Sequence, residues 1–237
     1  MIVGAGEGLG RSLAATFARN GCDLALISRS EAGMDATRRA VRAVAPGACV
    51  IAAVADAERP DELEAAIARI EAMRGSIDIL IYNVRAMTPL CAPLEMSYKQ
   101  LERSLRLEAV GALAAAKAVL PGMIVRGRGT LIFSSATAAF RGSATHPLYS
   151  IGKFALRGLA QSLARAYASR GVHVAHVRID CALDVPMMRA LALGDAKSGR
   201  LASPDSIAEA YWSIHCQPAA AWSNEVELRP SAEPWTF

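Results

Sequence analysis

The stretch Gly4-Ala5-Gly6-Glu7-Gly8-Leu9-Gly10 decides the fold of this chain, because it joins a short apolar run to an amphipathic helix. Only Met1-Ile2-Val3 precedes it, so the first strand is predicted to be unusually short. After Gly10, apolar residues recur at helical spacing until Asn20-Gly21 ends the helix. A strand, a glycine turn and a helix in this order form an anion site, since small residues let backbone N–H groups approach a phosphate at the positive end of a helix. Glycine-rich turns also serve as plain tight turns, so the rest of the chain has to support this interpretation.

The rest of the chain alternates between apolar runs typical of buried strands and longer stretches with helical periodicity. Strands are expected at Leu24–Ile27, Cys49–Val54, Ile77–Tyr82, Thr130–Ser134, Val172–Ile179 and Glu225–Leu228, and helices at Ala32–Val44, Asp61–Met73, Ser97–Val125, Pro147–Ser169 and Pro204–His215. The third of these helices is expected to be kinked or broken near Gly111 and Pro121. This alternation predicts an α/β protein with a Rossmann-like, doubly wound parallel sheet of about seven strands and helices on both faces. We expect a single domain over residues 1–237, because no repeat, linker or low-complexity segment divides the chain.

The composition argues against several classes of protein. Apolar residues make up 53% of the chain and the net charge is +4, so disorder is not expected. The basic residues are scattered and no aromatic stacking groups lie between them, which argues against nucleic-acid binding. The most apolar long stretch, residues 109–125, contains Lys117 and Pro121, and we expect it to be too short and too interrupted to cross a membrane. The N-terminus lacks a basic region followed by an apolar run, so no signal peptide is expected.

The cysteines and histidines bear on the compartment and on metal binding. The five cysteines are far apart and odd in number, without a Cys-x-x-Cys pair, so we expect free thiols in a cytoplasmic protein. His173 and His176 are three residues apart in a strand-like run, which directs them to opposite faces of a sheet. We therefore expect no metal site.

The pair Tyr149 and Lys153 carries the predicted chemistry, because residues four apart on a helix share one face. An unperturbed tyrosine, with a pKa of about 10, is a poor acid or base at neutral pH. A neighbouring ammonium group favours the phenolate and moves the tyrosine pKa toward working pH. A single Tyr-x-x-x-Lys is more often a half-buried tyrosine beside a solvated lysine, so this pair also needs support from elsewhere.

Two further positions bear on the nucleotide. Arg29 follows the second predicted strand, where an acidic residue would bind the ribose hydroxyls of NAD and an arginine can hold the 2′-phosphate of NADP. Arg29 therefore favours NADP(H) over NAD(H), although Glu7 in the phosphate turn opposes a 2′-phosphate and Arg29 could be an ordinary solvated charge. Asp56, just past the third strand, either accepts a hydrogen bond from an adenine amino group or closes a turn.

With these motifs in order, the chain resembles the short-chain dehydrogenase/reductase family over essentially its whole length. Gly4-x-x-x-Gly8-x-Gly10 is similar to the family's phosphate turn, Asp56 to its adenine contact, Asn83 to one asparagine of its Asn-Asn-Ala-Gly motif, and Tyr149-x-x-x-Lys153 to its active-site pair. The resemblance implies that the tyrosine exchanges a proton with the substrate oxygen, and that the lysine activates it and holds the nicotinamide ribose. The residues that it assigns to the nucleotide are Gly4, Gly8, Leu9, Gly10, Ser28, Arg29, Asp56, Asn83, Tyr149 and Lys153.

Several positions depart from the family pattern. The family's active-site serine lies thirteen residues before the tyrosine, where this chain has Ala136. Ser135 is predicted to take over the catalytic role, with Thr137 as the other candidate, but neighbours on a strand face opposite sides and either needs a shifted or bulged backbone. The helix asparagine that holds a proton-relay water in the family corresponds to Glu108. This carboxylate either relays protons or pairs with Lys153 and weakens its effect on Tyr149.

Two more motifs are altered. Asn-Asn-Ala-Gly has become Tyr82-Asn83-Val84-Arg85, which puts a large cation where the family has glycine. The Pro-Gly-x-x-x-Thr loop has become residues 180–185, so the threonine that bonds the nicotinamide carboxamide in the family is Val185 here. The chain resembles a divergent subgroup without the usual serine, which shares a similar phosphate turn, an Arg-Gly pair like Arg141-Gly142, and a Trp-containing C-terminal tail. No defined substrate comes with that subgroup.

The resemblance implies an NADP(H)-dependent carbonyl reductase or alcohol dehydrogenase, with Tyr149 as general acid or base and Lys153 as its activator. The alternative is a nucleotide-binding protein with little or no catalysis. A third hypothesis is that the substrate supplies the hydroxyl that Ala136 lacks. The substrate loop is expected at about 182–200, where Met187, Met188, Leu191 and Leu193 either line an apolar pocket or simply pack. The apolar helices at 101–120 and 156–163 resemble those that pair subunits in the family's dimers and tetramers, so a homodimer or homotetramer is expected.

Overall fold

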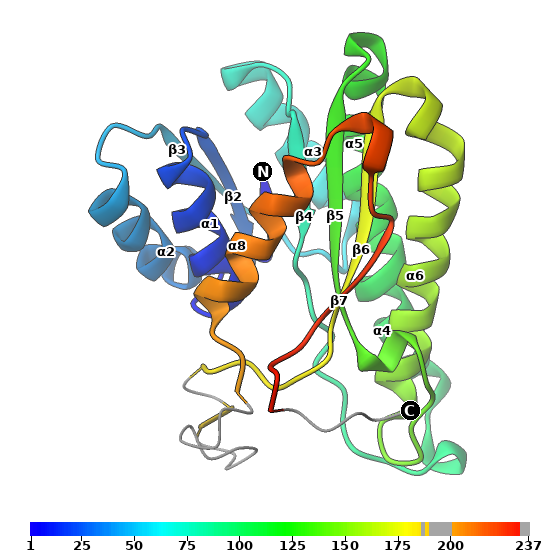
Figure 1. Ribbon diagram of the computed structural model, residues 1–237. Coiled ribbons are helices and arrows are strands. Elements are labelled where there is room, and N and C mark those ends of the chain that lie inside the picture. The colour runs from blue at the N-terminus through cyan, green and yellow to red at the C-terminus, as the bar shows by residue number, and fades with distance from the viewer. Residues whose placement is uncertain (186–187, 190–200, 233–237) are drawn as a thin grey trace.

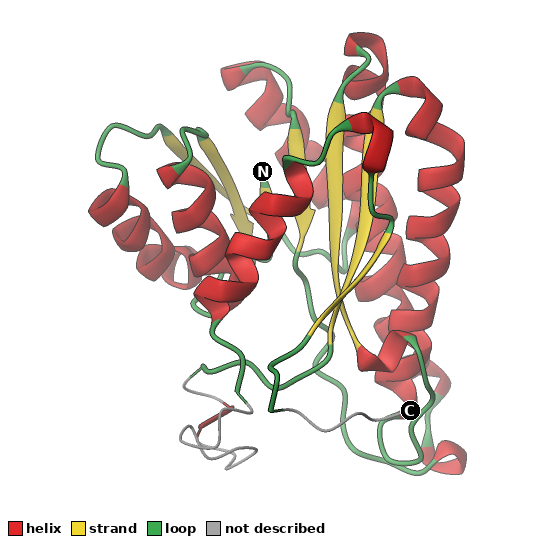
Figure 2. Cartoon of the chain, in the orientation of Figure 1, coloured by secondary structure: helices red, strands yellow, loops and turns green. Residues whose placement is uncertain are grey.

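The protein forms one seven-stranded parallel sheet with helices on both faces, as the computed structural model shows for residues 1–185, 188–189 and 201–232 (Figures 1 and 2). The strand order is β3-β2-β1-β4-β5-β6-β7, and every neighbouring pair is parallel. The strands are β1 (Ile2–Val3), β2 (Leu24–Ser28), β3 (Val50–Val54), β4 (Ile79–Tyr82), β5 (Gly129–Ala136), β6 (Val172–Ile179) and β7 (Glu225–Leu228). The chain order reverses between β1 and β4, where doubly wound sheets bind ligands at their carboxyl edge. The α/β, Rossmann-like prediction is confirmed, including the very short first strand.

Two layers of helices cover the sheet. One face carries α1 (Leu9–Arg19), α2 (Glu31–Val44) and α8 (Pro204–His215), and the other carries α3 (Pro60–Arg74), α4 (Tyr98–Leu105), α5 (Gly111–Arg126) and α6 (Pro147–Tyr167). Each layer closes its own apolar core against the sheet, because the strands are buried on both sides. In β5, for example, Leu131 and Phe133 pack toward α5, whereas Ile132 packs toward the opposite layer.

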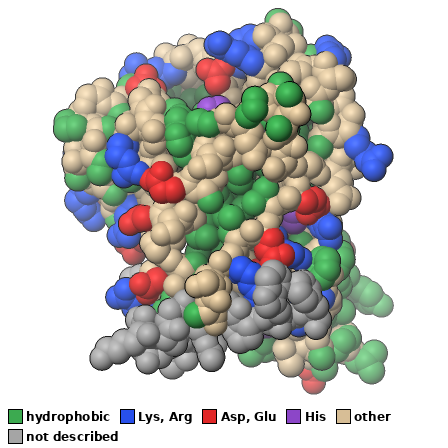
Figure 3. Space-filling view, in the orientation of Figure 1, with side chains coloured by type: hydrophobic (Ala, Val, Ile, Leu, Met, Phe, Trp, Pro, Cys, Tyr) green, Lys and Arg blue, Asp and Glu red, His purple; other side chains and the backbone are tan. Residues whose placement is uncertain are grey.

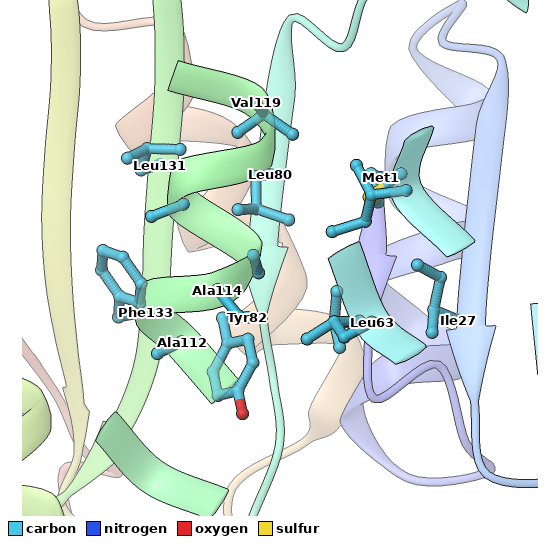
Figure 4. Packing of buried hydrophobic residues seen from close by; sticks show 14 of the residues in the cluster. Met1, Ile27, Leu63, Leu80, Tyr82, Ala112, Ala114, Val119, Leu131 and Phe133 are labelled. Atoms are coloured by element: carbon cyan, nitrogen blue, oxygen red, sulfur yellow. The ribbon is translucent and has the colours of Figure 1, made fainter. Parts of the chain in front are cut away.

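The helix at 98–126 is interrupted near Gly111, as expected, but continues without a break at Pro121. It is interrupted by a π-helical turn, Arg106–Val110, that ends immediately before Gly111. Pro121, where a kink or break was also expected, lies inside α5, which runs on to Arg126. The helix tolerates the lost N–H donor because the side chains around Pro121, including Val119 and Met123, are buried against the sheet and hold this segment in place (Figure 4).

This helical run also corrects the expectation about its length. By length and apolar composition, the 29 residues of Tyr98–Arg126 are sufficient to cross a membrane, although residues 109–125 alone looked too short. Half of its most apolar window is buried inside the fold, where α5 packs on α3 and on strands β4 and β5. Its packing is that of a core helix.

The apolar side chains of α6 are only partly internal. Leu156 and Leu163 are buried, while Phe154 is 43% exposed and Leu159 is half-buried. The difference arises because Phe154 lies on the side of α6 away from the sheet, a direction that periodicity alone does not give.

The histidines of β6 make stability depend on pH. Burial lowers the pKa of His176 to about 4, against the opposing effect of Glu225, whose carboxylate lies 3.1 Å from its Nδ1. Burial also lowers the pKa of His173. Because the unfolded chain binds protons at these positions below about pH 6.5 and the folded protein does not, stability falls as the pH decreases toward about 4.

We predict that replacing His176 with Gln flattens this dependence. Between about pH 6.5 and 4 the His176 contribution is at most about 3 kcal/mol of unfolding free energy. Urea denaturation of both proteins at several pH values measures it. An equal loss of stability on acidification in the variant and the parent would contradict the assignment.

Candidate active site

The glycine turn after β1 requires glycine at its two ends for steric reasons. Gly4 has a φ of +90°, and a Cβ there would lie 2.6 Å from the carbonyl oxygen of Asn83. A Cβ on Gly10 would lie 2.5 Å from the carbonyl oxygen of Gly4. The Asn83 side chain donates to that same Gly4 oxygen at 3.1 Å, which ties the turn to the end of β4. Within the turn, Gly6 has nothing within 4 Å of where a Cβ would sit, so this part of the backbone is open to a ligand.

Thr37 on α2 holds the turn from the other side, and sequence analysis missed it. Its buried hydroxyl donates to the carbonyl oxygen of Ala5 at 2.9 Å. Gly8 is the N-cap of α1, so the first N–H groups of that helix follow the open backbone directly. This arrangement of free backbone and helix N-terminus fits the pyrophosphate of a dinucleotide.

The residues predicted to bind the adenosine half of the nucleotide lie together beside the glycine turn. Ser28, Arg29 and Asp56 line one hollow with Gly4 and Gly6. Arg29 is exposed, and no described residue forms an ion pair with it. Asp56 accepts a hydrogen bond from the backbone N–H of Glu58 at 3.0 Å, so it closes a turn and borders the hollow at the same time.

Tyr149 and Lys153 share one face of the first two turns of α6, as predicted. The Lys153 Nζ lies 5.7 Å from the centroid of the Tyr149 ring. Lys153 is buried and donates to the carbonyl oxygen of Ser134 at 3.0 Å, which fixes it to β5. Tyr149 is half-buried and lines the main cleft.

Glu108 pairs with Lys153, which is one of the two roles expected for it. The Oε2 atom lies 2.7 Å from the Lys153 Nζ, with the Glu108 side chain fully buried and that of Lys153 only 3% exposed. The other oxygen, Oε1, accepts from the backbone N–H of Ala86 at 2.8 Å. The π-helical turn carries Glu108 into this position, and Gly152 makes room for it, since a Cβ there would lie 2.9 Å from the Glu108 Cγ.

The segment in place of the missing serine is a regular strand. β5 pairs with β6 without interruption from Gly129↔Val172 to Ala136↔Ile179, so the bulge that would turn Ser135 into the position of Ala136 is absent. The Ser135 hydroxyl is buried without a hydrogen-bond partner and lines the cleft. Thr137 also lines it, but its hydroxyl donates to the carboxylate of Asp180. A catalytic role for Ser135 stays a prediction.

Arg85 is a neighbour of Tyr149 for which sequence analysis had no role. It is exposed, and its Cζ lies 5.3 Å from the centroid of the Tyr149 ring. The only sequence signal was the cation in place of the family's glycine. Val185 comes close to the glycine turn, because a Cβ on Gly8 would lie 3.7 Å from its Cγ1.

The cleft that unites these residues has a volume of about 800 Å³ and runs from the glycine turn to α6. Of the residues expected in a substrate loop, Met188 is buried and lines the cleft, while Met187, Leu191 and Leu193 lie outside the described residues. Within the described ranges, no group of three or more His, Cys, Asp or Glu side chains is placed to hold a metal ion. On the face seen in Figure 3, basic and acidic side chains are interspersed.

Comparison with known proteins identifies the family. The profile of the short chain dehydrogenases matches residues 1–192, so this chain belongs to that family. Oxidoreductase UcpA of Escherichia coli K12 is 34% identical over 175 residues, which is 73% of this chain and 65% of UcpA. An uncharacterized oxidoreductase of Staphylococcus saprophyticus is 27% identical over 97% of this chain and 96% of its own.

Solved structures share the fold. A short-chain dehydrogenase from Rhodopseudomonas palustris superposes with a TM-score of 0.81 at 27% identity, covering 97% of this chain and 96% of that one. An alcohol dehydrogenase from Thermococcus sibiricus gives 0.87 at 21% identity over 100% of this chain and 98% of its own. At that identity the second similarity speaks for the fold alone.

The glycine turn gives a matched pair of variants. Gly4→Ala is expected to lower the unfolding free energy by about 1–3 kcal/mol and to displace the turn, because its Cβ would overlap a backbone oxygen at positive φ. Gly6→Ala, with open space around it, is expected to leave stability within about 0.5 kcal/mol of the parent. Denaturant unfolding of the three proteins tests this, and equal stabilities of the two variants would refute the steric argument.

Proposed function

We propose that the protein is an NADP(H)-dependent oxidoreductase of the carbonyl reductase or alcohol dehydrogenase type. The observation that carries the proposal is that Tyr149 and Lys153 lie in the same cleft as the open glycine turn. A family member with a tyrosine at the cleft and a buried lysine behind it has the parts needed for proton transfer to a substrate oxygen.

The residues of this chain have separate roles in that reaction. Gly4, Gly8, Leu9 and Gly10 receive the dinucleotide at the glycine turn and the start of α1, and the dinucleotide supplies or accepts the hydride when bound. Tyr149 donates its hydroxyl proton to the carbonyl oxygen in reduction and takes it back in oxidation. Lys153, fixed by Ser134 and Glu108, holds the ribose side of the cleft.

The missing serine predicts a slow enzyme. Ala136 offers no hydroxyl to polarise the carbonyl, and removal of one such donor lowers the rate by about 10²–10³ in other enzymes. Ser135 has a buried and unpartnered hydroxyl in the same cleft. We propose it as the substitute donor, a role that requires the end of β5, regular in this structure, to shift when substrate binds.

A second function is favoured by one observation. The buried carboxylate of Glu108 neutralises Lys153, the group that activates the tyrosine in this family. A protein that binds the nucleotide with little or no turnover would tolerate that pairing.

We also propose that the protein assembles as a homodimer or homotetramer and is located in the cytoplasm.

The deciding experiment is NADPH oxidation against a broad panel of ketones, aldehydes and quinones. We predict that Tyr149→Phe lowers turnover by about 10²–10⁴ while nucleotide affinity changes little, because the variant keeps the ring and loses only the phenolic hydroxyl. Turnover equal to that of the parent would refute the mechanism. Nucleotide binding without turnover in either protein would favour the second function.

The cofactor preference has its own test. Because Arg29 is exposed beside the adenosine hollow without a described acidic partner, it is placed to meet a 2′-phosphate. Arg29→Asp is expected to weaken NADP(H) binding at least about tenfold more than NAD(H) binding. Titration calorimetry with both nucleotides measures the difference, and equal losses would exclude this role.

A further inference from the structure

Two cations flank the ring of Tyr149, and they come from different parts of the chain. The Cζ of Arg85 lies 5.3 Å from the ring centroid, and the Nζ of Lys153 lies 5.7 Å from it. Arg85 follows β4 and reaches over from the glycine-turn side, whereas Lys153 comes from α6 itself. The two charges therefore lie about equally close to the centre of the ring.

Their surroundings are not equal. Lys153 is paired with Glu108 at 2.7 Å inside the protein, where little water screens the two charges from each other. The negative charge of Glu108 therefore offsets part of the Lys153 field at Tyr149. The pairing is held in place, because Ala86 donates to the other oxygen of Glu108 and Lys153 donates to Ser134.

Arg85 keeps its charge. In the described ranges, no side chain forms an ion pair or hydrogen bond with it, and its guanidinium lies over the Tyr149 ring. The other titratable groups that line the described cleft are Arg141, His146 and Asp180. Asp180 accepts from Thr137 and has the Arg229 guanidinium 3.7 Å away, so its charge is already paired.

We propose that Arg85 adds positive charge that favours the Tyr149 phenolate and makes up for the part of the Lys153 charge that Glu108 offsets. The two departures from the family pattern, a glutamate behind the lysine and an arginine before the tyrosine ring, then compensate each other. Arg85 acts through Tyr149 and is a positioning residue. Its catalytic consequence rests on the function proposed above, but its effect on the phenol does not.

The test is the absorbance titration of tyrosinate, which needs no substrate. Subtracting the curve of the corresponding Tyr149→Phe protein isolates Tyr149 from the other four tyrosines, Tyr82, Tyr98, Tyr167 and Tyr211. Arg85→Met is expected to move the Tyr149 midpoint to higher pH by about 0.5–1 unit, since an exposed cation acts through partly screened solvent. Arg85→Lys, which restores the charge, is expected to return most of that shift.

Two more variants make the test specific. Glu108→Gln frees the Lys153 charge and is expected to move the midpoint to lower pH. Arg141→Met removes a cation from the same cleft that has no described contact with Tyr149, and is expected to leave the midpoint in place. An unmoved midpoint in Arg85→Met, or an equal shift in Arg141→Met, overturns the proposal.

The two proposals fail separately. If the enzyme turns over, the pH profile of kcat/KM is expected to shift with Arg85→Met in the same direction as the titration. If no protein turns over while the midpoint moves as expected, the reductase function is refuted and the role of Arg85 is supported.

Discussion

The buried ion pair between Lys153 and Glu108 is the constraint on which the site depends. Removing two charges from water is costly unless close pairing and further hydrogen bonds offset the lost hydration, and breaking one partner of such a pair costs about 3–5 kcal/mol in other proteins. Here the pair joins three separate segments: α6, the π-helical turn before α5, and the end of β5. The π-helical turn makes this pairing possible, because its extra residue directs the Glu108 side chain toward Lys153, whereas a regular helix would direct it elsewhere.

The parallel sheet determines where this pair can act. All strands point the same way, so the segments that follow β1, β4, β5 and β6 meet at one edge. The glycine turn, Arg85, Tyr149 and Val185 are far apart in sequence and line one cleft for that reason. The glycine turn packs closely against the end of β4, since the backbone of Gly4 lies against that of Asn83 and leaves no room for a side chain.

The departures from the family pattern are connected in space. Glu108 pairs with Lys153, and Arg85 lies over the tyrosine that the lysine activates in the family. Ala136 leaves Ser135 as a buried hydroxyl without a partner in the same cleft. Together these changes alter the electrostatic environment around Tyr149. Their effect on the tyrosine therefore has to be considered jointly, and not by comparing one position at a time with the family pattern.

The sequence by itself determined the fold and, outside the segment at 97–126, most element boundaries to within two residues. Val172–Ile179, Pro204–His215 and Glu225–Leu228 have the predicted limits, because buried parallel strands and capped helices leave local signals in apolar runs, prolines and glycines. It also gave two possible roles for Glu108, proton relay and pairing with Lys153, and left the choice between them open. Only the tertiary structure decided that choice, kept α5 intact through Pro121, and brought Thr37 to the glycine turn and Arg85 to the Tyr149 ring. Each of these depends on packing between segments distant in the chain, and periodicity along one segment carries no information about which neighbour its side chains will meet.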